Sequence, residues 1–436
     1  MVERISTELS LEQFQERYLR LNKPCVFSGK FTKGWRSRIE WVKDGKPNAK
    51  YLSDNFGDCI IPVADCSKRH FNAHEKEEMT FKQFLDYWVQ VITNSVVDDR
   101  LLYLKDWHFQ REYPDYRAYE VLEYFQADWL NEWYDQNTST TDDYRFVYMG
   151  PKGTWTSFHA DVLRSYSWSA NICGKKKWLI FPPGEEENLK DLNGNLPFDV
   201  TCNELSDNKK YPKFHKAVKP IEIIQEEGEI VFIPSCWHHQ VHNLDHTISI
   251  NHNWTNAYGI NFVFQHLKAE LLLVEKEISE FRGTDGWVDQ CQLLLKCTAG
   301  LDYEQFIKML VDLMEPRFTI LKSFTRLKEN ADRRSETDHR ESMEVIEAWF
   351  RRLKITCIPG EHLKISKETL SEPVGLLFEQ EDIKCKMKNV IFDLEQLVEA
   401  FHSTYLEIAN DEIVSRMNGF VNYVKEVSSF VERYCK

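Results

Sequence analysis

The sequence predicts an α+β protein with a central sandwich or barrel of short strands, mixed helices and strands before it and a helical region after it. Two observations predict this class. Between residues 101 and about 255, short apolar runs alternate with Gly, Pro and Asn turns, as in sandwiches and barrels, jelly rolls included. After residue 258, apolar residues recur at helical spacing instead. We therefore expect three parts, 1–100, 101–257 and 258–436.

In the first part, residues 1–100, two capping boxes predict the starts of helices that support the barrel. They pair Ser10 with Gln13 and Thr80 with Gln83, each followed by apolar residues at helical spacing. The expected apolar faces are Leu11, Phe14, Tyr18 and Leu21 in the first helix, and Phe81, Phe84, Leu85, Trp88, Val89 and Ile92 in the second.

The strands of the central part are expected to be short and joined by tight turns. Gly174 lies between two of them and predicts a hairpin. The expected strands, two earlier ones included, are 25–27, 59–63, 101–104, 146–149, 166–173, 176–181, 229–233 and 247–254. In the last part, helices are expected at about 260–281, 303–321, 343–353 and from 394 to the end.

The composition restricts the partners and the compartment. A net charge of -14 argues against a dedicated nucleic-acid or anionic-membrane binder and fits a basic or neutral protein partner. The 11 cysteines contain no Cys-x-x-Cys pair, so we expect reduced thiols and no structural zinc module. The start lacks a secretory signal, and no apolar run is long enough to span a bilayer. These features predict a cytoplasmic, possibly also nuclear, protein.

Histidines and a carboxylate in two distant segments indicate a metal site. His159 and Asp161 stand two apart, so on a strand they point to the same side. The segment that starts at Gly228 ends in His238 and His239. Two imidazoles and one carboxylate on one face of an octahedral ion leave three positions open, as in non-haem iron(II) oxygenases. A zinc hydrolase can use the same three ligands, so the residues alone leave the metal open.

The segment from Tyr144 to Trp254 resembles the JmjC domain of the small jumonji hydroxylases. Besides the histidines, the resemblance rests on the runs Asp143–Pro151, Gly174–Pro183 and Asn243–Asn251. It implies a double-stranded β-helix, that is, a cupin-like jelly roll. It also implies iron(II), 2-oxoglutarate as co-substrate and O2, with hydroxylation of a protein side chain as the activity.

The resemblance assigns roles to single residues. His159 and Asp161 match the first two metal ligands, and the third, five residues after Pro234, is His239 rather than His238. These three ligands form the catalytic centre, and Lys176 matches the lysine that binds the distal carboxylate of 2-oxoglutarate. The other positions expected at the co-substrate are Thr156, Tyr103, Ser169, Asn251 and Asn253. Ser169 and Asn251 replace the asparagine and threonine of some hydroxylases.

Three alternatives for the activity remain. Hydroxylation and N-methyl-lysine demethylation differ in the carbon that is attacked. Many jumonji histone demethylases carry a glutamate ligand and zinc modules, whereas this chain has Asp161, so hydroxylation leads. A cupin-like binding protein without turnover is the third. The resemblance further implies a lysine of a translation release factor as the target. For the C-terminal helices three roles stay open: packing against the barrel, providing substrate surface, or forming a homodimer.

Overall fold

The structure, a computed structural model, describes residues 2–70, 73–93, 95, 100–136, 143–329, 381–407 and 411–434. These residues belong to two compact units. The β unit comprises residues 1–8, 21–121 and 141–254, and the helical unit comprises 9–20, 122–140 and 255–436. The predicted helix at 343–353 lies outside the described residues. The boundaries predicted between the three parts of the chain, near residues 101 and 257, stay a prediction.

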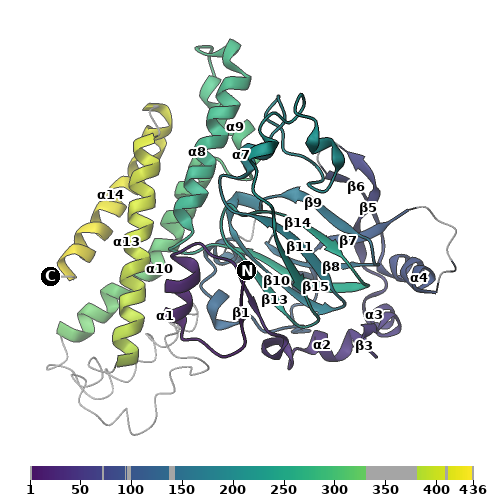
Figure 1. Ribbon diagram of the computed structural model, residues 1–436. Coiled ribbons are helices and arrows are strands. Elements are labelled where there is room, and N and C mark those ends of the chain that lie inside the picture. Colours follow the sequence, from purple (N-terminus) through teal and green to yellow (C-terminus); the bar gives the residue numbers. More distant parts are fainter. Residues whose placement is uncertain are drawn as a thin grey trace, which may run out of the picture. The chain divides into compact units, whose positions relative to one another are not determined.

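The β unit contains a nine-stranded sheet and a four-stranded sheet, together with the small hairpin β3 (Val42–Lys43) and β4 (Lys46–Pro47) (Figure 1). The large sheet runs in the order β1 (Glu3–Ile5), β2 (Cys25–Phe27), β13 (Ile230–Ile233), β10 (Tyr166–Cys173), β15 (Thr247–Trp254), β8 (Arg145–Gly150), β7 (Leu102–Trp107), β5 (Ile60–His70) and β6 (Ala73–Thr80). The small sheet runs in the order β12 (Ile221–Gln225), β11 (Lys176–Phe181), β14 (His238–Asn243) and β9 (Trp155–His159).

The two sheets pack against each other as the jelly roll that the sequence predicts. One buried apolar cluster joins them, with Val26 and Val231 from the large sheet and Trp178 and Val241 from the small one. The hairpin predicted at Gly174 is wrong, because β10 and β11 lie in different sheets and do not pair. The chain passes between the sheets at the β10–β11 turn, where Gly174 has a φ of 78°. A Cβ atom at Gly174 would lie 2.2 Å from the carbonyl oxygen of His246, so only glycine fits this turn.

The histidine-rich segment is not the single return strand that the sequence suggests. Its first half is β13 in the large sheet, and its second half is β14 in the small sheet. The turn between them includes Cys236, whose φ is 66°. The remaining predicted strands are confirmed, with shifted ends, whereas β1, β3, β4, β6 and β12 had no predicted counterpart.

Both predicted capping boxes are present. Thr80 caps α4 (Phe81–Ile92), and Ser10 caps α1 (Leu11–Phe14) in the helical unit, which continues as a π-helical turn over 15–19. Leu21 and Val89 were expected on the apolar faces, but they are 53% and 41% exposed. The short helices of the β unit are α2 (Arg36–Glu40), α3 (Ala49–Phe56), α5 (Phe109–Glu112) and α7 (Glu186–Leu189).

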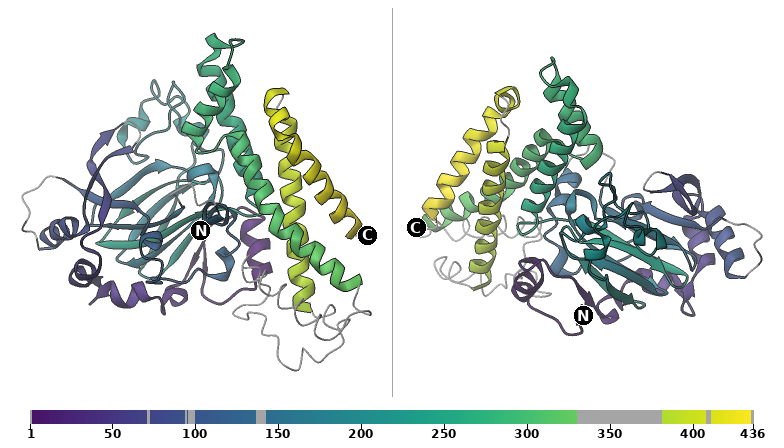
Figure 2. Two further views of the ribbon diagram at one scale, coloured as in Figure 1. Left: turned by 180° about the vertical axis from the view of Figure 1, so that it is seen from behind. Right: turned by 45° about the horizontal axis from the view of Figure 1, so that its top comes forward.

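The helical unit contains the short helix α6 (Trp129–Gln136) and longer helices that pack against one another (Figures 1 and 2). The longer helices are α8 (Ile260–Glu277), α9 (Trp287–Ala299), α10 (Tyr303–Glu329), α13 (Glu381–Glu407) and α14 (Asp411–Tyr434). The single helix expected from 394 to the end is two helices, and α9 was not predicted. Among the described residues, no helix combines the length and the apolar content needed to cross a membrane.

A buried arginine links three helices of this unit. Arg317 of α10 is 1% exposed and donates two hydrogen bonds to Glu132 of α6, at 2.9 and 3.0 Å. Its Nε atom donates a third, at 2.9 Å, to Asp393 of α13. A buried cation is stable only when it is paired in this way, so this network fixes the three helices relative to one another.

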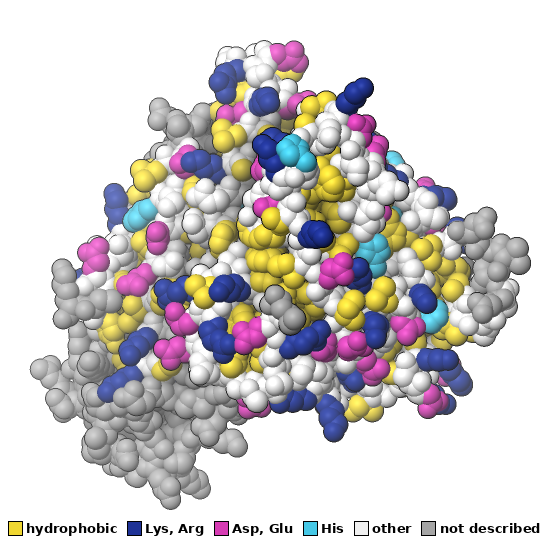
Figure 3. Space-filling model, in the orientation of Figure 1, with side chains coloured by type: hydrophobic (Ala, Val, Ile, Leu, Met, Phe, Trp, Pro, Cys, Tyr) yellow, Lys and Arg dark blue, Asp and Glu magenta, His cyan; other side chains and the backbone are white. Residues whose placement is uncertain are grey.

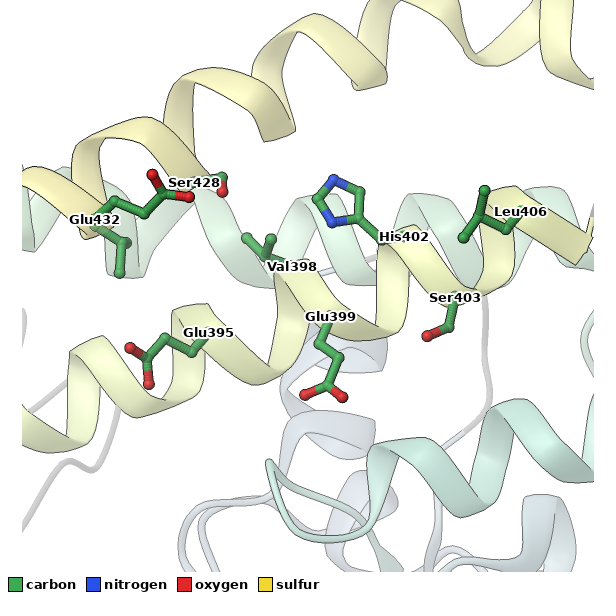
Figure 4. Close-up of a pocket in the computed structure, with 9 residues that line it drawn as sticks. Glu395, Val398, Glu399, His402, Ser403, Leu406, Ser428 and Glu432 are labelled. Carbon is green, nitrogen blue, oxygen red and sulfur yellow. The ribbon is translucent and has the colours of Figure 1, made fainter.

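A groove of about 720 Å³ lies between α13 and α14 (Figure 4). Its lining includes three glutamates, Glu395, Glu399 and Glu432, together with Val398 and Val431. On the molecular face drawn in Figure 3, acidic and basic side chains are intermixed.

Candidate metal and co-substrate site

His159, Asp161 and His239 meet at one point in the β unit. One ligand atom from each side chain lies within 4.8 Å of the others. His159 ends β9 and faces its register partner His239 on β14, and the two ring centroids are 4.4 Å apart. Asp161 follows the end of the strand, and its backbone stays extended with φ -60° and ψ 155°. The three side chains predicted as a triad are therefore brought together, and the triad is the metal-binding cluster found among the described residues.

A bulge in β9 sets which of its residues face the inside of the jelly roll. His239 pairs with His159, but Val241, two residues later, pairs with Thr156, three residues earlier. The extra residue on β9 shifts the alternation of side chains, as β-bulges do. Thr156 and His159 thus point to the same side although they are an odd number of positions apart.

Both histidine ligands are oriented by carbonyl groups of their own strands. The Nδ1 atom of His159 lies 2.8 Å from the carbonyl oxygen of Ser157, and that of His239 lies 3.1 Å from the carbonyl of Trp237. A carbonyl only accepts, so each Nδ1 carries the proton, which leaves each Nε2 lone pair free for a metal ion. Burial and the neighbouring His239 lower the pKa of His159, which favours the neutral form that binds metals.

Asp161 is held by a side chain of the large sheet. The hydroxyl of Ser167 on β10 donates to Asp161 Oδ2 at 2.7 Å. The bond leaves Oδ1 free to bind a metal ion and fixes the orientation of the carboxylate.

His238, the other candidate for the third ligand, is engaged elsewhere. It is 2% exposed, and its Nε2 accepts from Arg164 Nη1 at 3.3 Å. Burial, then the Arg164 charge, lowers the pKa of His238 to about 3, so the ring is neutral. The placement of the two neighbours therefore agrees with the choice of His239.

Lys176 lies on β11 on the same side as His239. It is 2% exposed and donates to Ser249 Oγ at 2.8 Å and to the Tyr103 hydroxyl at 3.4 Å. Burial, then the nearby Lys105 charge, lowers the pKa of Lys176 to about 7. Among the described residues it has no acidic partner within ion-pair distance. A buried amine with hydroxyls but no carboxylate around it fits a ligand that brings the carboxylate.

The other predicted pocket residues lie on the same inner faces. Thr156 pairs with Val241 of β14, and Lys176 pairs with Asn243 of the same strand. Because Val241 and Asn243 are two residues apart, Thr156 and Lys176 lie on the same face of the small sheet. On the large sheet, Ser169 is opposite Asn251, and Asn253 is opposite Ser167. The Ser169 hydroxyl is buried and has no hydrogen-bond partner among the described residues, so it can still bond to a ligand.

The sequence reasoning missed Ser167 and Ser249, which contact Asp161 and Lys176. A detectable pattern was present, because polar residues occupy every second position of β15 from Ser249 to Asn253 and of β10 from Ser167 to Asn171. On a strand this alternation predicts one polar face. Only the packing of the two sheets in the structure shows that this polar face lines the site.

The donor set fits iron(II) and 2-oxoglutarate. Two imidazole nitrogens and one carboxylate oxygen leave positions for a bidentate keto acid and O2. Lys176, Ser249 and Tyr103 provide donors for the far carboxylate of that acid.

Comparisons with known proteins agree with this fit. The family described as Cupin-like domain matches residues 11–260. A 2-oxoglutarate and iron-dependent oxygenase JMJD4 of Gallus gallus is 52% identical over 313 residues, which is 71% of this chain and 73% of that protein. Its namesake in Danio rerio is 50% identical over 334 residues, with 76% and 78% covered. The arginine-specific demethylase JMJ20 of Arabidopsis thaliana is 41% identical over 341 residues, with 74% and 72% covered.

Proposed function

This chain belongs to the cupin-like family of 2-oxoglutarate- and iron-dependent oxygenases of the JMJD4 type, and on that premise we propose that it hydroxylates a side chain of a protein substrate. The cofactors of this class are iron(II), 2-oxoglutarate and O2. The observation that carries the proposal is the joint placement of the triad and of Lys176, a buried amine without an acidic partner among the described residues.

In this proposal, each residue of the site has a separate task. His159, Asp161 and His239 hold iron(II), and Ser167 keeps the Asp161 carboxylate in place. Bound iron(II) would activate O2 together with 2-oxoglutarate, so that one oxygen atom of O2 enters the C–H bond and the other enters succinate, with release of carbon dioxide.

The far carboxylate of 2-oxoglutarate would be held by Lys176 together with the hydroxyls of Ser249 and Tyr103, which already contact the Lys176 amine. The protein contributes ligation, orientation and a pocket from which water is excluded.

We propose a lysine of a translation release factor as the target. The support is the resemblance to the small jumonji hydroxylases, one of which is associated with that substrate. The net charge of -14 is compatible with a basic or neutral protein partner.

The test is a coupled assay of succinate and peptide mass. The purified protein, loaded with iron(II), is incubated with 2-oxoglutarate and lysine-containing peptides from a release factor. Gain of one oxygen by a peptide, together with succinate, is the expected result. Asp161→Ala is the control that removes one metal ligand. Succinate no higher than in this control, with every peptide tried, would contradict the proposal.

Demethylation is the second candidate, favoured by one observation. The relative JMJ20 is named an arginine-specific demethylase. The same assay with methylated arginine and methylated lysine peptides distinguishes the two activities. Loss of one methylene, with formaldehyde, indicates demethylation, whereas gain of one oxygen on the unmethylated peptide indicates hydroxylation.

We also propose that the protein acts in the cytoplasm, and possibly the nucleus, as a homodimer through its C-terminal helices. All nine cysteines among the described residues are free thiols, which is compatible with a reducing compartment. Fractionation of cells and light scattering of the purified protein test the two points separately.

A further inference from the structure

Lys105 is a half-buried lysine that the site described so far does not use. It lies on β7, two residues after Tyr103, so both side chains leave the strand on the same side. The Lys105 ammonium lies 5.9 Å from the ring centroid of Tyr103 and 5.6 Å from that of Tyr148. The hydroxyl of the first ring reaches Lys176. Lys105 thus lies next to the wall of the co-substrate pocket.

The carboxylate of Asp106 acts on the charge of Lys105, but the two groups form no ion pair. Within the described ranges, its ammonium takes part in no hydrogen bond or ion pair. The adjacent carboxylate of Asp106 is already bound by Lys76 at 2.6 Å and by the Tyr148 hydroxyl at 2.6 Å. By contrast, Lys175 and Lys177 each lie 3.0 Å from a glutamate. The tyrosine rings attract the ammonium only weakly, so a ligand anion would add a strong partner.

Lys105 is also within electrostatic reach of Lys176, whose amine touches the Tyr103 hydroxyl. Burial and, after it, the Lys105 charge lower the pKa of Lys176. Two ammonium groups held near each other repel, and an anion with two carboxylates removes that repulsion.

We propose that Lys105 is a second cationic anchor for 2-oxoglutarate, acting on the dianion between the metal triad and Lys176. The inference depends on the co-substrate of the family and not on the proposed protein target. Succinate also has two carboxylates, so Lys105 should strengthen the binding of this product as well.

The experiment measures binding without turnover. Wild type and variants are loaded with manganese(II) and titrated by calorimetry with 2-oxoglutarate and with succinate, without peptide. Lys105→Met should raise both dissociation constants about tenfold, the effect of losing one charge-assisted hydrogen bond. Lys105→Arg, which keeps the charge, should stay within about threefold. Lys177→Met, which removes a lysine already paired with Glu222, is the matched control and should change nothing.

Three outcomes would overturn the inference. One is a Lys105→Met dissociation constant for 2-oxoglutarate within about twofold of wild type. Another is a turnover assay in which the variant raises KM for the peptide but not for 2-oxoglutarate, because Lys105 would then serve the substrate. Absence of 2-oxoglutarate binding by the wild type would reject the co-substrate and the anchor together. Manganese affinity and thermal unfolding show whether Lys105→Met is folded; if it is not, Lys105→Gln is titrated against the same thresholds.

Discussion

At the scale of single residues, the adjacent His238 and His239 offer a matched pair of substitutions. His239→Ala removes a triad imidazole, whereas His238→Ala removes a ring that accepts from Arg164. We expect His239→Ala to lower metal affinity and turnover by about 100-fold or more, because only two ligands remain. His238→Ala should keep metal affinity within a few-fold of wild type. Metal titration followed by calorimetry measures both, and the reverse ranking would reassign the third ligand.

Lys176 predicts how co-substrate binding depends on pH. Its pKa in the empty pocket is about 7, and a carboxylate binds the protonated form. Above pH 7 the empty site loses this proton and must regain it on binding. The dissociation constant for 2-oxoglutarate should therefore rise with pH, by up to about tenfold per unit. Titrations from pH 6.5 to 8.5 test this, and Lys176→Met should bind weakly with a much flatter profile.

The same lysine gives a stability prediction of defined sign. Its folded pKa of about 7 lies below the unfolded value of about 10.4, so between these values the unfolded chain holds more protons. The contribution of Lys176 is therefore least favourable below pH 7, and stability should rise with pH across this window. The free energy of unfolding is measured with urea for the ligand-free wild type and for Lys176→Met at each pH. The difference between the two proteins gives the contribution of Lys176. If the unfolding free energy of the wild type changed with pH in the same way as that of the variant, the lowered pKa of Lys176 would be contradicted.

At the scale of elements, Gly150 at the end of β8 allows Tyr103 of β7 to pack closely. A Cβ atom there would lie 2.5 Å from Tyr103 Cδ2 and 2.8 Å from Thr154 Oγ1. We expect Gly150→Ala to cost about 1–3 kcal/mol of unfolding free energy and to weaken 2-oxoglutarate binding, because Tyr103 must move away. Gly34→Ala is the control, since no atom lies within 4 Å of its Cβ position. Denaturant unfolding and calorimetry measure the two effects, and equal results for both variants would contradict this reading.

The elements also show what the sequence could predict. Capping boxes at Ser10 and Thr80 are local patterns, because the cap and its partner are three residues apart, and both are confirmed. The neighbouring strands β10, β11, β13 and β15 were predicted from their own apolar runs, whereas β9 and β14, which carry the two histidines of the triad, were not. The bulge in β9 was not, because it depends on how β9 pairs with a strand some eighty residues away.

The same reason explains the missed contacts of the site. Ser249 and Lys176 are 73 positions apart, so only the pairing of strands brings them together. His239 could be chosen because the resemblance supplied its spacing from Pro234. The break between α13 and α14 was missed because both helices show helical periodicity.

At the scale of the whole molecule, the Arg317 network gives a prediction for the helical unit. Arg317→Met would leave Glu132 and Asp393 without their cation. We expect a loss of about 3–5 kcal/mol, because an unpaired buried charge remains. Lys308→Met, which breaks the more exposed pair with Asp312, should cost about 1 kcal/mol or less. Denaturant unfolding compares the two, and adding Glu132→Gln and Asp393→Asn to Arg317→Met should recover part of the loss.

The strand order of the large sheet has a consequence for synthesis on the ribosome. The strands β1 and β2 lie at its beginning in sequence, but β2 pairs with β13, which starts some two hundred residues later. The pocket needs Tyr103 from an early strand and Asn253 from the last one. Nascent chains shorter than about 254 residues therefore lack a complete site, and the edges of their early strands have no partner strand to pair with. The helical residues after 254 are translated later than the last strand of the β unit, so the β unit can close while they are being made.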